Sequence, residues 1–376
     1  MQIEAMLKAM VDGGASDGFV TVGARPTIKI NGDLVAMDFP ACDEEEVHRL
    51  IESTMSDAQV AEFNRENESN YAINHPEFGR FRASAYVQRA LPGLVMRRIS
   101  ADIPSLAELG LPNVIEQLAM LKRGLVIFVG GTGTGKSTSL ASMIDYRNTH
   151  SRGHIITVED PIEYVHNHKG CLISQREVGL DTDSYDVALK NTLRQAPDVI
   201  MIGEIRTAET MEAALAFAET GHLCLSTLHA NNANQALDRI QSFFPPSKHN
   251  QVWMDLSLNM KAMVAQQLLP RRDGKGRTPV VEVLLATSLI QDHIRKGEVH
   301  LIKEVMERST ELGMQTFDQS LFAAYKANLI TADDAIRHAD SANDVRLNIK
   351  MHQRGNTAFN EDNMGLEVET TSPIRR

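Results

Sequence analysis

The chain has 376 residues, of which 43% are hydrophobic and 23% charged. These proportions are typical of a soluble globular protein, long enough for two ordinary domains. The net charge of −11 argues against broad electrostatic binding to nucleic acid or anionic lipid. The cysteines are scattered, so we expect neither a disulfide framework nor a cysteine-based zinc site. With no signal peptide and no apolar run of membrane-spanning length, the sequence predicts a cytosolic protein.

Residues 1–102 mix short helices and strands and are predicted to form an N-terminal α/β domain. In RPTIKINGDLV, Asn31-Gly32 separates two apolar runs, which predicts a β-hairpin. In CDEEEVHRLIESTM, apolar residues recur at helical spacing. FGRFRASAYVQ alternates, which places Arg80 and Arg82 together on the face opposite the apolar side chains.

The pattern changes after residues 103–112 (IPSLAELGLP), whose Pro and Gly predict a linker. Across residues 113–290, short Val- and Ile-rich runs alternate with helical or looping segments: GLVIFVG, HIITVED, DVIMIGE, HLCLSTLHA and PVVEVLLAT. This alternation predicts a parallel sheet covered by helices. Residues 291–350 are predicted to be helical. Residues 351–376 are polar and turn-rich and are predicted to be disordered.

The segment GGTGTGKS fits the pattern G-x-x-x-x-G-K-[ST], between a predicted strand and a predicted helix. Glycines let such a loop wrap its backbone N–H groups around a phosphate, while the lysine contacts the β- and γ-phosphates and the serine hydroxyl contacts Mg²⁺. The sequence therefore predicts a nucleotide triphosphate site. Its expected binding residues are Gly130, Gly131, Thr132, Gly133, Thr134, Gly135, Lys136, Ser137 and Thr138.

Hydrolysis also needs a carboxylate that positions water, and two stretches offer one. Glu159, Asp160 and Glu163 cluster where the strand HIITVED ends, and ligands of open α/β sheets sit at the carboxyl ends of strands. The strand DVIMIGE resembles a Walker B strand, which usually ends in Asp, but Gly203 occupies that position and Glu204 follows. Glu204 either holds Mg²⁺ through water and organises the attacking water, or is only a carboxylate at a helix start.

Two histidines frame the strand HLCLSTLHA: His222 begins it and His229 ends it. A histidine on a strand is more often structural than part of a site. His229, together with Thr227, lies at the carboxyl end, where it could contact a γ-phosphate and report its loss. Neither histidine has the spacing of a zinc ligand.

The P-loop, VEDPIEY, GEIRTAET and STLHANNA, in this order and spacing, resemble the PilT-like secretion ATPases, the hexameric motors of type IV pili and type II secretion. The family names these stretches Walker A, Asp box, atypical Walker B and His box. The resemblance runs from about residue 1 to about residue 350 and includes ASDGFVTVGARPTIKINGDL, FGRFRASAY and GMQTFDQSL. It implies an α/β fold: an N-terminal α/β (PAS-like) domain, a RecA-like P-loop ATPase core with a parallel sheet, and C-terminal helices.

Within the family, the chain is most similar to the retraction branch. It lacks the long N-terminal extension and the four-cysteine insertion common in other members. DHIRKGE (Asp292 to Glu298) is similar to the retraction motif A-I-R-A-G-E but departs from it at Asp292, His293 and Lys296. Thr207 stands where retraction motors commonly carry Asp. These departures resemble the accessory type of retraction ATPase.

The resemblance implies roles for single residues. Glu163 would be the catalytic glutamate that polarises water, and Glu204 would support Mg²⁺ together with Ser137. His222 and His229 would couple the nucleotide state to the subunit interface, with His222 contributing to nucleotide binding and His229 to catalysis.

Arg82 and Arg97 match arginines of the family that reach the nucleotide when the N-terminal domain closes on the core. From the residues alone, a strand face that carries arginines could stabilise charge on a transferring phosphoryl group. The alternative is an ordinary solvated strand face.

The sequence thus predicts an ATP- and Mg²⁺-dependent hexameric motor of the accessory type that powers type IV pilus retraction and twitching motility. Its expected partners are a paralogous retraction ATPase and the inner-membrane pilus platform protein, and no nucleic acid. It would be cytoplasmic, docked at the inner face of the cytoplasmic membrane without insertion.

Three alternatives stay open. A nucleotide-gated adaptor with little turnover would agree with Thr207 and the altered DHIRKGE. A DNA-translocating RecA-like ATPase is disfavoured by the charge of −11. A GTPase lacks support because no [NT]-K-x-D motif follows the core strands.

Overall fold

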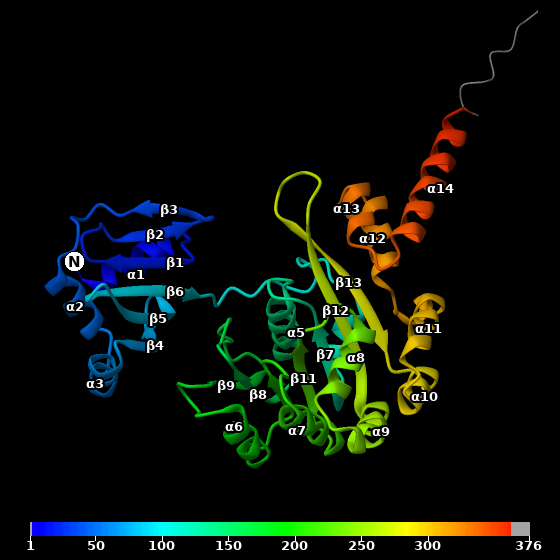
Figure 1. The fold of residues 1–376 in the computed structure, drawn as a ribbon, viewed down its shortest axis with the longest axis horizontal. Helices are drawn as coiled ribbons and strands as arrows, with labels where there is room; N and C mark the ends of the chain where they lie inside the picture. The colour runs from blue at the N-terminus through cyan, green and yellow to red at the C-terminus, as the bar shows by residue number, and fades with distance from the viewer. Residues whose placement is uncertain (1, 362–376) are drawn as a thin grey trace, which may run out of the picture. The chain divides into compact units, whose positions relative to one another are not determined.

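The fold is that of a computed structural model, which describes residues 2–361. By its internal contacts the chain forms two compact units. The first unit comprises Met1–Ser105 and Ala141–Glu204, and the second comprises Leu106–Leu140 and Ile205–Arg376. The chain contains a six-stranded sheet and a seven-stranded sheet, whose strands can be followed in Figure 1.

The six-stranded sheet is antiparallel throughout, with the order β3-β2-β1-β6-β5-β4. Its strands are β1 (Asp17–Thr21), β2 (Thr27–Ile30), β3 (Asp33–Ala36), β4 (Glu68–His75), β5 (Gly79–Gln88) and β6 (Leu91–Ile99). The predicted hairpin is confirmed, since Ile30 of β2 pairs with Asp33 of β3. Its turn residues Asn31 and Gly32 have φ values of 53° and 97°, the left-handed conformation that a two-residue type I′ turn needs at both positions.

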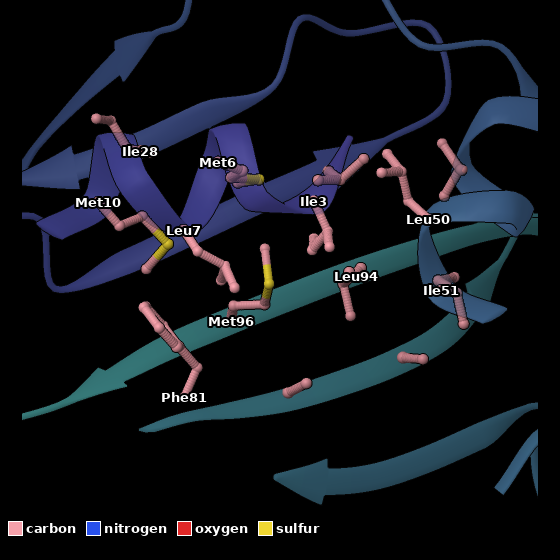
Figure 2. Packing of buried hydrophobic residues seen from close by; sticks show 14 of the residues in the cluster. Ile3, Met6, Leu7, Met10, Ile28, Leu50, Ile51, Phe81, Leu94 and Met96 are labelled. Atoms are coloured by element: carbon pink, nitrogen blue, oxygen red, sulfur yellow. The ribbon is translucent and has the colours of Figure 1, made fainter. Parts of the chain in front are cut away.

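Three helices, α1 (Ile3–Asp12), α2 (Glu44–Glu52) and α3 (Asp57–Glu66), belong to this part of the chain. Side chains of α1 and α2 pack on one face of the sheet against Phe81, Leu94 and Met96, as Figure 2 shows. The strand β5 alternates as predicted: Phe81 is fully buried, whereas Arg80 and Arg82 lie half-buried on the opposite face. The sheet therefore has one apolar face and one face rich in polar and charged groups.

The seven-stranded sheet has the order β13-β12-β7-β11-β10-β8-β9. Its strands are β7 (Gly124–Val129), β8 (Gly153–Glu159), β9 (Cys171–Glu177), β10 (Val199–Ile202), β11 (Leu223–Leu228), β12 (Met260–Pro270) and β13 (Arg277–Leu285). Strands β12, β7 and β11 run parallel, as do β10, β8 and β9. Sequence reasoning missed β9 and β12, and β13 departs from the expected parallel arrangement because it returns antiparallel beside β12.

The remaining helices surround these strands or follow them along the chain. They are α4 (Val114–Ala119), α5 (Lys136–His150), α6 (Tyr185–Thr192), α7 (Ala208–Glu219), α8 (Ala233–Ser242), α9 (His249–Asn259), α10 (Ser288–Lys296), α11 (Ile302–Arg308), α12 (Phe317–Lys326), α13 (Ala332–Arg337) and α14 (Ala342–Glu361). Short 3-10 turns occur at η1 (Leu193–Gln195), η2 (Pro246–Lys248), η3 (Val299–Leu301) and η4 (Thr310–Leu312). The predicted helical character of residues 291–350 is thus observed.

The prediction of disorder for residues 351–376 agrees with the structure only in part. Helix α14 continues to Glu361, into the stretch 351–376 for which the sequence predicts disorder. Residues 362–376 lie outside the described residues. Residues 103–112 contain no helix or strand, and their role as a linker between domains remains a prediction. Among the described helices, none combines the length and the apolarity that a membrane span requires.

Candidate nucleotide site

The phosphate loop lies in the second unit, where it follows the buried strand β7 and leads into helix α5. Gly133 and Gly135 have φ values of 77° and 87°, a left-handed conformation that glycine adopts without a steric cost. A Cβ atom on Gly135 would also lie 2.7 Å from the side-chain nitrogen of Gln266. The backbone therefore requires glycine at these positions, and the loop has the shape that the sequence motif predicts.

Lys136 begins α5, and only 8% of its surface is exposed. Its ammonium group donates to the carbonyl oxygens of Gly130 (2.9 Å) and Gly131 (2.7 Å), and the hydroxyl of Thr134 also donates to Gly131 (3.0 Å). The lysine thus reaches back across the loop that it follows. Hydrogen bonds from ammonium to phosphate are charge-assisted and stronger than those to neutral carbonyls, so phosphate oxygens could replace these partners.

Sequence reasoning missed Gln266, a buried residue of β12 that supports the loop. Its side-chain nitrogen donates to the carbonyl of Thr134 (2.9 Å), and its oxygen accepts from the hydroxyl of Ser139 (2.8 Å). One amide therefore fixes both the loop and the first turn of α5. The only signal in the sequence was a pair of glutamines inside the apolar run AMVAQQLL.

In the first unit, the carboxylates at the end of β8 differ in their surroundings. Glu159 is 8% exposed and accepts hydrogen bonds from Thr157 (2.6 Å) and Gln175 (3.2 Å). Burial raises the pKa of Glu159 to about 7. Glu163, four residues further on, is exposed. Of the two, Glu163 is the carboxylate that water and a ligand can reach.

Steric crowding in the first unit explains why the Walker B strand is followed by glycine where aspartate is usual. Gly203 follows β10, and its N–H donates to the carbonyl of Val158 on β8 (2.8 Å). A Cβ atom at position 203 would lie 2.8 Å from the hydroxyl of Tyr185 and 3.2 Å from Cα of Glu159. The usual aspartate has no room there, and the acidic residue of this stretch is the half-buried Glu204.

The two histidines of the His box lie at opposite ends of strand β11. His229 follows the end of β11, where the carbonyl of Leu228 accepts from the N–H of Gly130 (3.2 Å), so it leaves the sheet at the same edge as the phosphate loop. His222 precedes β11, and its carbonyl accepts from Gly124 at the start of β7. The strand has six residues, which separates the two histidines by roughly 20 Å. The role of His222 in nucleotide binding remains a prediction.

Arg82 and Arg97 face each other directly across the β5–β6 pair of the N-terminal sheet. Arg97 is exposed, and its Nε lies 2.8 Å from a carboxylate oxygen of Asp17, the next residue in that row. Like charges directly opposite on a sheet are unfavourable, and an anion bound between them would relieve the repulsion. The arrangement agrees with the predicted contact to phosphate, which the structure does not itself test.

Arg80, on the same strand face, makes a different contact. Its guanidinium lies 3.1 Å from the buried carboxylate of Glu177 on β9. Glu177 is also placed 3.4 Å from the N–H of Ile162, the residue before Glu163. Arg80 therefore contacts a side chain that supports the Asp-box loop.

Among the described residues, no group of three or more His, Cys, Asp or Glu side chains could hold a metal ion. Mg²⁺ at phosphate sites usually keeps several waters and is bound through one or two carboxylates together with phosphates of the substrate. The hydroxyl of Ser137, directly after the phosphate-loop lysine, fits a metal that arrives with a triphosphate.

Comparison with known proteins decides the family. The type II/IV secretion system protein family matches residues 3–324. The chain belongs to this family. It is 58% identical over 372 residues to the type IV pilus ATPase PilU of Pseudomonas aeruginosa, across 99% of this chain and 97% of that protein. It is 37% identical over 335 residues to the type IV pilus retractation ATPase PilT of the same organism, across 89% and 97% of the two chains.

The fold agrees with that of a solved structure of the family. The crystal structure of the pilus retraction motor PilT with bound ADP matches with a TM-score of 0.85 and 39% identity, covering 91% of this chain and 98% of that chain. The predicted resemblance to PilT-like secretion ATPases is confirmed, as is the predicted α/β fold with a P-loop core.

The departures from the retraction pattern of this family have local structural roles. The side chain of Thr207 caps α7 by accepting from the N–H of Thr210, a role that Asp fills equally well. In the last turn of α10, Asp292 forms ion pairs with Arg295 and with Lys296 (2.6 Å). His293 contacts Glu298 (2.9 Å). The altered motif thus forms ion pairs of its own.

Proposed function

We propose that this chain, an ATPase of the secretion family, is a hexameric motor of the accessory type that powers type IV pilus retraction and twitching motility. One observation carries the proposal: a phosphate loop with the required glycine conformations and a buried Lys136 lies in a chain that aligns over 99% of its length with a type IV pilus ATPase.

In the proposed mechanism, the loop N–H groups bind the β-phosphate of ATP. Lys136 exchanges the carbonyls of Gly130 and Gly131 for β- and γ-phosphate oxygens. The hydroxyl of Ser137 would hold Mg²⁺, with Glu204 contributing through water. Mg²⁺ bound in this way would neutralise part of the charge on the phosphates.

The carboxylate of Glu163 would orient the attacking water and accept its proton, because it is exposed, whereas Glu159 is held by Thr157 and Gln175. Arg82 and Arg97 would stabilise the charge on the transferring phosphoryl group when the N-terminal domain closes on the core. His229 would contact the γ-phosphate and respond to its loss.

Six chains in a ring would convert these motions into displacement of an axial partner. We propose that this partner is the inner-membrane pilus platform protein, reached from the cytoplasm, and that a paralogous retraction ATPase works on the same platform. Hydrolysis would then withdraw pilin from the base of the fibre.

A nucleotide-gated adaptor with little turnover is the second candidate. It is favoured by the ion pair of Asp292 with Arg295, because this pair engages the arginine that the chain shares with the retraction motif. Steady-state ATPase assays, on the purified chain alone and with the paralogous motor, separate the two. The motor hydrolyses ATP alone, whereas the adaptor needs the paralogue or shows no turnover.

The catalytic assignment is tested with two substitutions. Lys136→Ala is expected to abolish ATP turnover, and Glu163→Gln is expected to keep ATP binding while lowering kcat by about 100-fold or more, a typical cost of removing a general base. Binding of a fluorescent ATP analogue and phosphate release are the measurements. Glu44→Gln, an exposed carboxylate on α2, serves as the control. Normal hydrolysis by Glu163→Gln would show that another group positions the water.

The cellular role is tested by measuring pilus retraction in cells that lack this chain, with and without the paralogous motor. An accessory motor predicts that retraction survives the deletion but weakens under load. Complete loss of retraction would indicate a sole driver instead.

A further inference from the structure

A buried carboxylate on β13, Glu282, has no part in the mechanism above. Its residue is 3% exposed, and burial raises the pKa of its carboxyl group to about 7. In the sheet, Glu282 pairs with Ala265 of β12, which pairs in turn with Val129, the last residue before the phosphate loop. Glu282 therefore lies level with the end of β7 from which the phosphate loop emerges, and two strands away from β7.

The carboxyl group of Glu282 binds the first residue of helix α8. Its Oε1 accepts from the backbone N–H of Ala233 (2.7 Å), and helix N-termini favour negative charge. The neighbouring strand residue Val281 is hydrogen-bonded to helix α12, because its N–H donates to the hydroxyl of Ser320 (3.1 Å) in the first turn of that helix. The side chain of Glu282 and the backbone of its strand thus connect the starts of the two helices.

The two helices belong to different parts of the second unit. Helix α8 begins four residues after His229 and is capped by Asn232, so its first turn continues directly from the predicted γ-phosphate contact. Helix α12 belongs to the C-terminal helical region. There, the adjacent strand β13 is fastened to the same segment by reciprocal backbone hydrogen bonds between Val283 and Gln315 (2.8 and 3.1 Å).

The surroundings of Glu282 are polar on the side of the C-terminal helices. A cavity of about 260 Å³ is lined by Asn232, Asn234, Glu282, Lys303, Met306 and Asp340. Across it, Lys303 of α11 forms an ion pair with Asp340 (3.0 Å). Asn234 of α8 donates to the carbonyl of Val299 (3.1 Å). The start of α8 thus meets the C-terminal region through directional polar contacts beside a cavity.

We propose that Glu282 is a positioning residue that couples the His box to the C-terminal helices. By holding the first turn of α8 on β13, whose neighbouring residues are hydrogen-bonded to Gln315 and Ser320 at the start of α12, it passes a displacement of residues 229–232 on to α12. Without Glu282, the remaining polar groups around the cavity rearrange, and the displacement does not reach α12. The inference rests on the proposed function in one respect, namely that residues 229–232 respond to the nucleotide.

The test is hydrogen exchange of the full-length chain, with and without Mg²⁺ and a non-hydrolysable ATP analogue. In the wild type, the analogue is expected to slow exchange in three segments: 130–138, 229–235 and 316–320. In Glu282→Ala, protection of 130–138 is retained. The response of 316–320 falls at least about fivefold, because the N–H of Ala233 loses its acceptor on β13.

Two further variants complete the experiment. Glu282→Gln, a near-isosteric change, keeps one acceptor oxygen for the N–H of Ala233 and is expected to restore the response of 316–320. Glu304→Gln, an exposed carboxylate on α11, is the matched control and leaves all three responses unchanged. The KM for ATP stays within about twofold of the wild type in all variants, since Glu282 is proposed to touch no part of the nucleotide. A role in stability alone would lower the melting temperature without uncoupling the responses.

The outcomes separate the two proposals. If the analogue protects 130–138 and 229–235 but leaves 316–320 unchanged in the wild type, the coupling is refuted and the nucleotide site stands. A wild-type response at 316–320 that persists in Glu282→Ala also refutes it. If no segment of the wild type responds, the proposed nucleotide binding itself is wrong. The wild-type arms keep the test decisive even if Glu282→Ala fails to fold.

Discussion

The two sheets of the molecule expose their residues to water in different ways. In the seven-stranded sheet, every residue of β7, β10 and β11 is buried. In the N-terminal sheet, β5 alternates between buried residues and half-buried or exposed ones, and every residue of β3 is exposed. Sheets built of parallel strands are covered on both faces, whereas antiparallel sheets often keep one face in water.

This difference decides where each sheet can carry chemistry. In the seven-stranded sheet, the predicted site residues Lys136, Glu163 and His229 lie in the segments that follow β7, β8 and β11. In the N-terminal sheet, a whole face is available, and Arg82 and Arg97 lie within strands on that face. Substitutions at strand ends should therefore disturb packing and activity together, whereas substitutions on the N-terminal sheet face should affect activity alone.

The largest effect is expected for Gly203→Asp, which would give β10 the aspartate that usually ends a Walker B strand. Its Cβ atom would clash with Tyr185 and with the backbone of β8, and a carboxylate would enter a crowded site. The free energy of unfolding should fall by about 4 kcal/mol or more. Gly203→Ala, the control without a charge, should cost about 2 kcal/mol. Denaturant unfolding measures both, and wild-type stability in Gly203→Asp would contradict the steric explanation.

The next effect concerns the pH dependence of stability through Glu159. Its pKa in the folded chain, about 7, lies above the ordinary value of 4.5, so its contribution to stability is complete below pH 4.5. That contribution is lost as the pH rises through 7. Glu159→Gln should therefore gain stability relative to the wild type between pH 5 and pH 8, by roughly 3 kcal/mol at most. Denaturant titrations at pH 5 and pH 8 measure the difference in the free energy of unfolding between the variant and the wild type. If this difference is the same at both pH values, the carboxyl group titrates normally.

The smallest change in free energy is expected for the N-terminal sheet. Arg82→Ala and Arg97→Ala should each lower kcat for ATP by about 100-fold, the lower end of the losses seen for charge-stabilising groups, with melting temperatures close to that of the wild type. Lys29→Ala is the matched control, because Lys29 pairs with Asp17 in the same row of the sheet. Equal kcat in all three variants would mean that the arginines form an ordinary solvated face.

Much of the fold could be predicted because local patterns determine it. The hairpin at Asn31-Gly32, the alternation along β5 and the apolar strands β7, β8, β10 and β11 were all readable, since period and turn chemistry act over a few residues. Strand β12 was missed because its apolar run MKAMVAQQLLP follows α9 without a Gly or Pro between them. Strand β9, CLISQRE, was missed because polar residues interrupt it.

The candidate site was readable to a similar degree. The phosphate loop, the Asp box, Glu204 and the His box follow from motif and order in the sequence. Gln266 could not be found, because its two partners lie more than a hundred residues away in the sequence. The reason for glycine at position 203 was equally hidden, since the crowding atoms belong to β8 and α6.

The sequence by itself determined the phosphate loop, the order of the acidic and histidine motifs, and the alternation of strands and helices, because these depend on backbone geometry and on neighbours a few residues apart. Only the tertiary structure decided that Glu159 and Glu282 are buried while Glu163 is exposed. Burial and partnership of a charged group depend on which distant segments pack against it, and that information exists only once the chain has folded.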